Sequence, residues 1–260
     1  DKTKIKNIAK AIKNNANGVE INLDLRGTSG LTEIQSSCFS SCNGLTGIVL
    51  PAGITSIANH AFSGIESLKS VVIPDGVESI GNSAFNYCTS LSEAVIPGSV
   101  KSIGSNAFSI CALSELVIPD SVTEFGGTGA FLMSGISSLK IGKGLTAIPD
   151  NTFQANNLKK VTVPSNVESI GTSAFELNSG LAEVVLEEGV KTIGDRAFRG
   201  GCFASITIPK SVTSIGDKAF GSSELTVYYN GTVEEWKELR ANIGSGCENL
   251  LNTTVKCIGE

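Results

Sequence analysis

A phenylalanine returns along this sequence every 22 or 23 residues. It stands at nine positions: Phe39, Phe62, Phe85, Phe108, Phe131, Phe153, Phe175, Phe198 and Phe220. In most repeats an apolar residue followed by proline comes twelve residues earlier, as Ile73-Pro74 comes before Phe85. A period this regular over most of a chain predicts a solenoid, in which each repeat covers the apolar face of its neighbour.

The segment 68–74, LKSVVIP, shows how one repeat divides into secondary structure. Val71 and Ile73 occupy inward positions and Val72 an outward one, which predicts a short strand with one buried face. Pro74 ends the strand, because a residue without an N–H cannot extend a ladder of backbone hydrogen bonds. We therefore expect about nine short parallel strands on one face of a right-handed solenoid.

The return path of each repeat carries an Ile-Gly pair and then an Ala-Phe pair. Glycine here suits a turn that needs positive φ or a close approach of two backbones, at Gly81, Gly104, Gly171, Gly194 and Gly216. The next residue is of a helix-capping type: Asn82, Ser105, Thr172, Asp195 and Asp217. We expect a single turn of α- or 3₁₀-helix that brings the phenylalanines into one internal ladder.

Residues 1–18 predict a helix that caps the N-terminal end of the solenoid. Four apolar residues follow the spacing of one helix face: Ile5, Ile8, Ala9 and Ile12. Gly18 stands where such a helix would end. Five lysines crowd the same segment, and we interpret them as its solvated face.

Residues 228–260 predict a C-terminal cap, which leaves residues 19–227 for the solenoid. Asn230-Gly231 is a turn signal, and Thr232 and Glu235 have the spacing of a capping box at the start of a helix. That helix is expected to bury three apolar residues: Val233, Trp236 and Leu239.

The L-x-x-I-x-I-P strand and the I-G-x-x-A-F-x-x-C return path resemble the BspA-like class of leucine-rich repeats over roughly residues 19–228. The resemblance implies a repeat solenoid of the α/β leucine-rich type, with a parallel sheet on its concave face and a helix at each end. It also implies a cell-surface or secreted protein associated with adhesion and host contact, without enzymatic activity. Gly142 and Glu187 depart from the pattern, because they replace the proline that ends the strand.

Four of the seven cysteines follow the phenylalanine column: Cys42, Cys88, Cys111 and Cys202. They could form a ladder of disulfides or metal ligands between repeats, or they could fill a tight apolar column where other repeats place Asn or Ser. We expect the second arrangement, with most thiols reduced. If a disulfide does form, Cys247 and Cys257 are the expected pair.

The sequence offers no set of residues suited to catalysis, to a metal or to a cofactor. Cys38 and Cys42 would supply only half of a zinc site, and His60 is the single histidine available to a catalytic triad. The segment 125–131, FGGTGAF, lacks the lysine of a phosphate-binding loop, and the repeat register assigns Gly126 to the Ile-Gly position. We expect no enzyme, no metal and no cofactor.

The net charge of −5, from 20 basic and 25 acidic residues, argues against a nucleic-acid partner. No apolar run reaches the roughly 18 residues of a transmembrane segment, and no charged stretch followed by an apolar one marks a signal peptide. We expect a chain that is monomeric in solution, with a protein or a glycan as its partner.

The outward strand positions are predicted to form two columns on the sheet. The first holds Val49, Val72, Val95, Val117, Lys140, Thr162, Val185, Thr207 and Thr226. The second holds Gly47, Ser70, Glu93, Glu115, Ser138, Lys160, Glu183, Ser205 and Glu224. Contiguous exposed apolar residues mark contact sites, so we predict a partner-binding site at Val72, Val95, Val117, Glu93 and Glu115.

An alternative reading is that these β-branched side chains only stabilise the sheet through cross-strand packing. On balance the sequence favours a non-enzymatic, adhesin-like binding module that contacts a macromolecular, host-derived partner through the concave sheet. An architectural or self-associating surface repeat is the second hypothesis.

Overall fold

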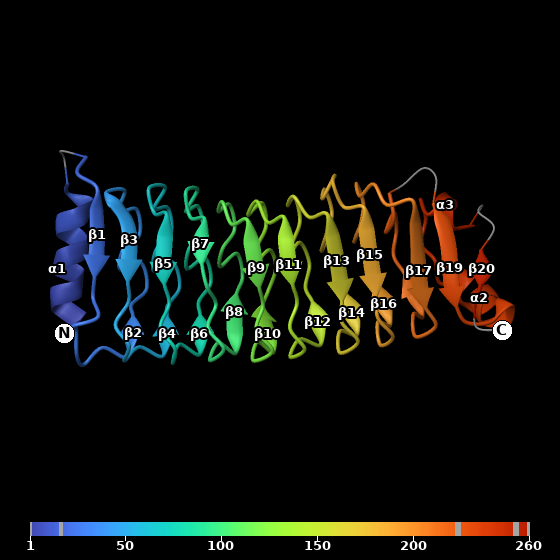
Figure 1. Cartoon of the computed structure of the whole chain (residues 1–260), viewed down its shortest axis with the longest axis horizontal. Helices are drawn as coiled ribbons and strands as arrows, with labels where there is room; N and C mark the ends of the chain where they lie inside the picture. Colours follow the sequence, from blue (N-terminus) through green and yellow to red (C-terminus); the bar gives the residue numbers. More distant parts are fainter. Residues whose placement is uncertain (1, 16–17, 222–224, 252–254, 259–260) are drawn as a thin grey trace.

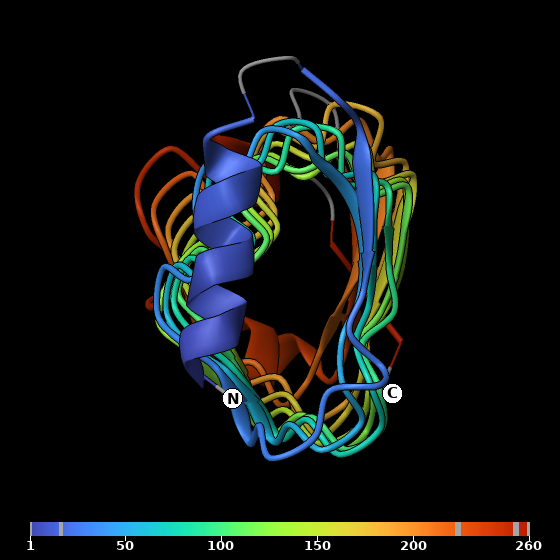
Figure 2. The same cartoon turned by 90° about the vertical axis from the view of Figure 1, so that its left-hand side faces the viewer.

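The computed structural model describes residues 2–15, 18–221, 225–251 and 255–258, which form a solenoid of stacked turns (Figure 1). The long strands run down the front of Figure 1 and the chain returns behind them as it advances, so the coil is right-handed. Seen along the axis, the turns nearly superpose (Figure 2). The row is therefore almost straight, and the concavity expected of the strand side is slight.

Each turn contains one long strand with an inward and an outward face, as the alternating pattern predicts. Neighbouring strands that pair are parallel and lie one repeat apart, so that Ile48 lies beside Val71. We call the surface that they form the strand face. The strands are β1 (Ile21–Asp24), β3 (Leu45–Val49), β5 (Ser70–Val72), β7 (Glu93–Ala94), β9 (Glu115–Val117), β11 (Ser138–Lys140), β13 (Lys160–Val163), β15 (Glu183–Leu186), β17 (Ser205–Pro209) and β19 (Thr226–Asn230).

The return path also contains strands, and the expected turn of helix before each phenylalanine is wrong. The chain there forms short parallel ladders followed by non-helical turns. Ladders between turns satisfy the backbone N–H and C=O groups, so that a helix is not needed for this purpose. These strands are β2 (Glu33–Ile34), β4 (Ser56–Ile57), β6 (Ser79–Ile80), β8 (Ser102–Gly104), β10 (Glu124–Gly126), β12 (Ala147–Ile148), β14 (Ser169–Ile170), β16 (Thr192–Ile193) and β18 (Ser214–Ile215).

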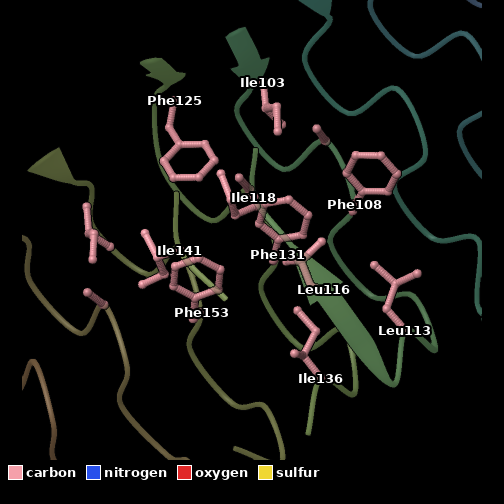
Figure 3. Packing of buried hydrophobic residues seen from close by; sticks show 14 of the residues in the cluster. Ile103, Phe108, Leu113, Leu116, Ile118, Phe125, Phe131, Ile136, Ile141 and Phe153 are labelled. Atoms are coloured by element: carbon pink, nitrogen blue, oxygen red, sulfur yellow. The ribbon is translucent and has the colours of Figure 1, made fainter. Parts of the chain in front are cut away.

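The nine phenylalanines form the predicted ladder through the core. Each is at most 1% exposed, and neighbouring ring centroids lie 4.9 to 5.7 Å apart with nearly parallel planes. Figure 3 shows three rungs, Phe108, Phe131 and Phe153. Phe125 packs edge-on against the second and third of these rings. The ladder therefore extends from the first repeat to the last.

The glycine of the Ile-Gly pair is required by space and not by its φ angle. A Cβ on Gly104 would lie 2.5 Å from the backbone nitrogen of Asn82 in the preceding turn. This confirms the close approach, whereas the alternative of positive φ is wrong for this column. The left-handed residue comes two positions later, as at Asn106, where φ is 54°.

The residues of helix-capping type bond from turn to turn instead of starting a helix. The side-chain oxygen of Asn59 accepts the N–H of Asn82 at 2.8 Å, and that of Asn82 accepts the N–H of Ser105 at 2.9 Å. Asp150 and Asp195 repeat the arrangement further along. These side chains thus satisfy backbone donors along the stack and fix the register of the turns.

Helices close both ends of the solenoid. At the N-terminal end, α1 (Lys2–Lys13) buries Ile5, Ala9 and Ile12, while Ile8 stays 36% exposed, contrary to expectation. The side chain of Ile8 therefore lies outside the contact between the helix and the first repeat.

At the C-terminal end, α2 (Val233–Arg240) begins with the predicted capping box between Thr232 and Glu235. Trp236 and Leu239 are buried, whereas Val233 is 39% exposed because it opens the helix before the chain turns inward. The helix α3 (Glu248–Leu251) and the strand β20 (Lys256–Cys257), which pairs with β19, complete this end. The predicted boundary between the solenoid and the C-terminal cap, between residues 227 and 228, falls inside β19.

Candidate binding surface

The strand face displays the predicted valines. Val72, Val95 and Val117 are 55%, 78% and 56% exposed, and they belong to three successive turns. Val49 pairs with Val72 at the N-terminal side and is half-buried. Beyond Val117 the column continues with Lys140, its partner in the ladder. The apolar part of the column is therefore bounded by a basic side chain.

The ladder is interrupted beside the most exposed of these valines. β7 ends at Ala94, so Val95 lies just beyond the strand, and β9 pairs with β11 instead of β7. Ala94 occupies the inward position that Val71 and Leu116 fill in the adjacent turns, and it is only half-buried. A smaller inward side chain gives this turn less packing. The expected continuous sheet is divided here, and again between β11 and β13 and between β15 and β17, although the turns remain stacked.

The two predicted glutamates are exposed and available to a partner. Within the described residues, neither Glu93 nor Glu115 has a lysine or arginine nitrogen within 4.0 Å. Further along the same column, Glu183 is different, because its carboxylate lies 2.6 Å from the ammonium of Lys160. Unpaired acidic charge on this face is therefore found beside the valines.

The register of the columns differs from the prediction at the C-terminal end. Thr226 pairs with Ser205 and so belongs to the second column, while Tyr228 pairs with Thr207 and ends the first. The predicted register placed Glu224 on the strand face only four residues after Phe220, whereas Glu93 comes eight residues after Phe85. That register therefore left too few residues between the phenylalanine and the strand. Glu224, predicted for the second column, lies outside the described residues.

Three cysteines occupy the tight column behind the phenylalanines, as expected. The thiols of Cys88 and Cys111 donate to the carbonyls of Phe62 and Phe85 in the preceding turns, at 3.1 and 3.3 Å. Cys42 makes the same kind of bond to α1. In later turns Ser134, Asn156 and Asn178 bond the corresponding phenylalanine carbonyls. The column therefore serves to satisfy buried carbonyls.

Burial keeps these thiols protonated. It raises the pKa of Cys88 to about 12 and that of Cys38 to about 11, and it raises the pKa of Cys111 as well. No disulfide joins any of the seven cysteines, all of which lie in the described part of the chain. Cys247 and Cys257, named as the pair to expect if a disulfide formed, are therefore not bridged.

Cys202, grouped with this column in the sequence, is exposed and lies outside it. It stands four residues after its phenylalanine instead of three, which moves its side chain out of the tight position.

The described residues contain no group of three or more His, Cys, Asp or Glu side chains that could hold a metal ion. His60 is exposed in a left-handed turn, and Gly126 pairs with Gly104 in the Ile-Gly column as its register predicts. None of the helices in the described segments is long and apolar enough to cross a bilayer.

A second exposed apolar column lies on the return path, away from the strand face, and the sequence reasoning missed it. It occupies the second position after seven of the nine phenylalanines, and we call it the back stripe: Gly64, Tyr87, Ile110, Met133, Ala155, Leu177 and Gly200. In the first turn the same position holds the polar Ser41. Tyr87, Met133 and Leu177 are 53%, 53% and 55% exposed. The signal was present in the sequence, as apolar residues at one fixed position of consecutive repeats.

The model of the BspA type leucine-rich repeat region matches residues 8–134 and 127–226, in six copies. These ranges cover most of the chain. The chain belongs to this family. A search of curated proteins finds no match.

Three solved structures are similar to this BspA-type chain. A leucine-rich repeat protein from Bacteroides ovatus is 25% identical with a TM-score of 0.75, over 94% of this chain and 70% of its own. A leucine-rich cell surface protein from Faecalibacterium prausnitzii is 25% identical with a TM-score of 0.62, over 80% and 69%. A leucine-rich repeat protein from T. pallidum is 28% identical with a TM-score of 0.54, over 70% and 76%. The fold and the resemblance stated from the repeat columns are thereby confirmed.

Proposed function

We propose that this BspA-type protein is a non-enzymatic binding module, secreted or displayed on a cell surface, that holds a macromolecular partner on its strand face. The observation that carries the proposal is the group formed by Val72, Val95 and Val117 with the unpaired Glu93 and Glu115. The cell-surface location described for the Faecalibacterium relative supports the proposed location. Repeats of this family are typically non-enzymatic, which agrees with a role in binding.

The proposed site suits a protein or a glycan that carries positive charge or hydrogen-bond donors. Valine is stiff at χ1, so its burial costs little rotamer freedom, and the underlying strands are held by the core. Glutamates at the edge of the patch would steer a basic partner and make association sensitive to salt. A sheet of stacked strands about 40 Å long can bury a standard-sized interface. A net charge of −5 disfavours nucleic acid.

The test is a binding screen against matrix proteins and glycans, followed by substitution of the valines. The double variant Val95→Lys, Val117→Lys should lose at least about tenfold in affinity for whichever ligand binds, because two charges replace buried apolar contacts. Both side chains point outward, so circular dichroism and the unfolding midpoint should stay close to wild type. The matched control is Val185→Lys with Thr207→Lys, which changes the same column further along.

Unchanged binding by a correctly folded Val95→Lys, Val117→Lys variant would place the site elsewhere on the chain. Equal losses in the test and control variants would show a general charge effect instead of a local site. If the ligand is basic, its binding should also weaken as the salt concentration rises. This salt dependence should be smaller in the double variant Glu93→Gln, Glu115→Gln, which lacks the two negative charges.

A self-associating role is the second candidate function. It is favoured by one specific observation, the exposed back stripe on the side of each turn away from the strand face.

A further inference from the structure

The back stripe presents one residue per turn in seven consecutive turns. The N–H of a member donates to the carbonyl of the residue just before the next member: that of Tyr87 donates to Ser109 and that of Met133 to Gln154, at 3.0 and 2.9 Å. Each turn advances about 5 Å, so the stripe is about 30 Å long. Ile110 and Ala155 are half-buried and complete the apolar row.

The backbone of the stripe makes its apolar composition unusual. Every member has positive φ, from 53° at Met133 to 89° at Gly200, a region that favours glycine and, next, asparagine. For the β-branched Ile110, with φ 57°, the conformation is strongly disfavoured. A second left-handed column, two residues after the Ile-Gly glycine, carries polar residues: Ser37, His60, Ser83, Asn106, Asn151, Ser173, Arg196 and Lys218. Backbone geometry alone therefore does not select large apolar side chains.

The surface around the middle of the stripe, in the turns of Tyr87, Ile110, Met133 and Ala155, is free of charge, whereas the outer turns carry Glu66, Glu176, Asp195, Arg196 and Arg199. The return paths 79–92, 102–114, 125–139 and 151–158 contain no Asp, Glu, Lys or Arg. Depletion of charge together with Tyr and Met is the composition of the buried centre of a protein–protein interface. The strand face, by contrast, carries charged side chains in most turns.

The order of residues along the stripe indicates which partner covers it. Around Met133 the stripe is nearly symmetric: Ile110 and Ala155 lie one turn away, Tyr87 and Leu177 two turns away, and Gly64 and Gly200 three turns away. A two-fold axis at Met133 would set the large Ile110 of one copy against the small Ala155 of the other. It would also set Tyr87 of one copy against Leu177 of the other. An interface between identical copies must be self-complementary in this way, whereas a different partner imposes no such order.

The charges at the two ends of the stripe fit the same arrangement. Glu66, exposed, follows Gly64 at one end, while Arg199, half-exposed, precedes Gly200 at the other. An antiparallel pair brings Glu66 of one copy toward Arg199 of the second. Arg199 also contacts the buried Glu176 at 3.3 Å, which holds its guanidinium near this end. The lysines of α1 lie beyond the first repeat, outside the symmetric segment.

From these features we propose that the protein forms an antiparallel homodimer through the back stripe, with the two-fold axis at Met133. The sequence alone had led us to expect a monomer, and the proposed dimer differs from that expectation. The stripe is short, so the dimer is reversible and depends on concentration. Both strand faces remain exposed in it, and the assembly can hold two copies of a ligand or bind a repeating ligand with avidity.

Sedimentation velocity of the protein over a range of concentrations tests this proposal. The wild type should shift from monomer to dimer, and Met133→Lys should raise the dimer dissociation constant at least about a hundredfold, because two lysines then meet at the axis. Val95→Lys, on the strand face, is the matched control and should leave the dimer intact. The same variant distinguishes the proposed dimer from the proposed ligand site, because Val95→Lys should weaken ligand binding and leave dimerisation unchanged.

A charge reversal at Glu66, which is exposed, tests the antiparallel orientation and leaves the contact between Arg199 and Glu176 in place. Glu66→Arg should weaken the dimer about tenfold, because it sets a second arginine against Arg199 of the other copy, whereas Glu66→Gln should weaken it less. A wild type that stays monomeric at every concentration would overturn the proposal, as would a dimer that Val95→Lys disrupts and Met133→Lys does not. Equal dimer dissociation constants for Glu66→Arg and the wild type would overturn the antiparallel arrangement.

Discussion

Truncation of Phe108 to alanine is the sharpest test of the phenylalanine ladder. The side chain is fully buried in the middle of the stack, and its ring centroid lies 4.9 Å from that of Phe85 and 5.4 Å from that of Phe131. Figure 3 shows Phe108 among the other buried side chains of the core.

The cost of Phe108→Ala follows from the contacts that it removes. Burial of a phenylalanine side chain contributes about 1.5–3 kcal/mol, and each of the two stacked ring pairs contributes about 0.5–1.5 kcal/mol more. The variant should therefore lose about 3–5 kcal/mol of unfolding free energy, which is the usual range for such a truncation.

Urea unfolding followed by circular dichroism measures this loss, provided that the slope of the transition stays unchanged. Fluorescence of Trp236, the single tryptophan, reports separately on the C-terminal cap and shows whether the stack unfolds in parts.

Tyr87→Ala is the matched control for Phe108→Ala. Tyr87 is an aromatic residue that is 53% exposed, so its truncation should cost less than about 1 kcal/mol when measured on dilute protein. A loss under about 1 kcal/mol for Phe108→Ala, or equal losses in the two variants, would refute the reasoning that the ladder holds the turns together.

Three further predictions concern the narrow columns beside the ladder. Alkylation in denaturant without reductant should label five or more of the seven cysteines, whereas in the native protein Cys202 should react well before Cys88. Because burial raises the pKa of Cys88 from 9.0 to about 12, its contribution to stability is complete below about pH 9 and is lost as the pH rises toward 12; Cys88→Ser should reduce that loss in unfolding experiments. Gly104→Ala should cost about 1–3 kcal/mol by overpacking, while Gly98→Ala, with open space around it, should be nearly neutral.

Each of these outcomes can fail in a specific way. Mass spectrometry that detects a Cys88–Cys111 bridge would refute the packing role of the cysteines. An alkaline stability profile unchanged by Cys88→Ser would show that this thiol does not govern it. Equal unfolding midpoints for Gly104→Ala and Gly98→Ala would mean that the turns can separate at little cost.

The sequence was sufficient for the parts of the fold that depend on burial. Nine phenylalanines in one register can be covered only by stacked turns, and the alternation around Val71 places Val72 outside, as observed. The spacing of Thr232 and Glu235 likewise identified the capping box. Each of these features depends on side-chain type at short range, so it can be read without coordinates.

The predictions about the fold that were wrong concern features that depend on contacts between turns. The return path could be read as a helical turn or as a strand, and hydrogen bonds to neighbouring turns decide in favour of the strand. Left-handed backbone at Asn106 and Ile110 is imposed by the same bonds, so residue type carries little warning of it.

The candidate site was predictable in part. Exposure of the valines follows from alternation, but the break beside Val95 depends on the packing of Ala94, and the shift at Thr226 depends on a path length. The back stripe could have been found by comparing the second position after each phenylalanine, had glycine at Gly64 and Gly200 not obscured the pattern.

Carboxyl-group footprinting of the protein with a ligand from the screen tests the proposed strand-face site most directly. Glu93 and Glu115 are exposed beside the valines, while Glu66 is exposed on the return path. If the ligand binds the strand face, Glu93 and Glu115 should lose reactivity toward the carbodiimide reagent on complex formation and Glu66 should keep it. Protection of Glu66 or of the helical caps, with Glu93 and Glu115 still reactive, would contradict the account.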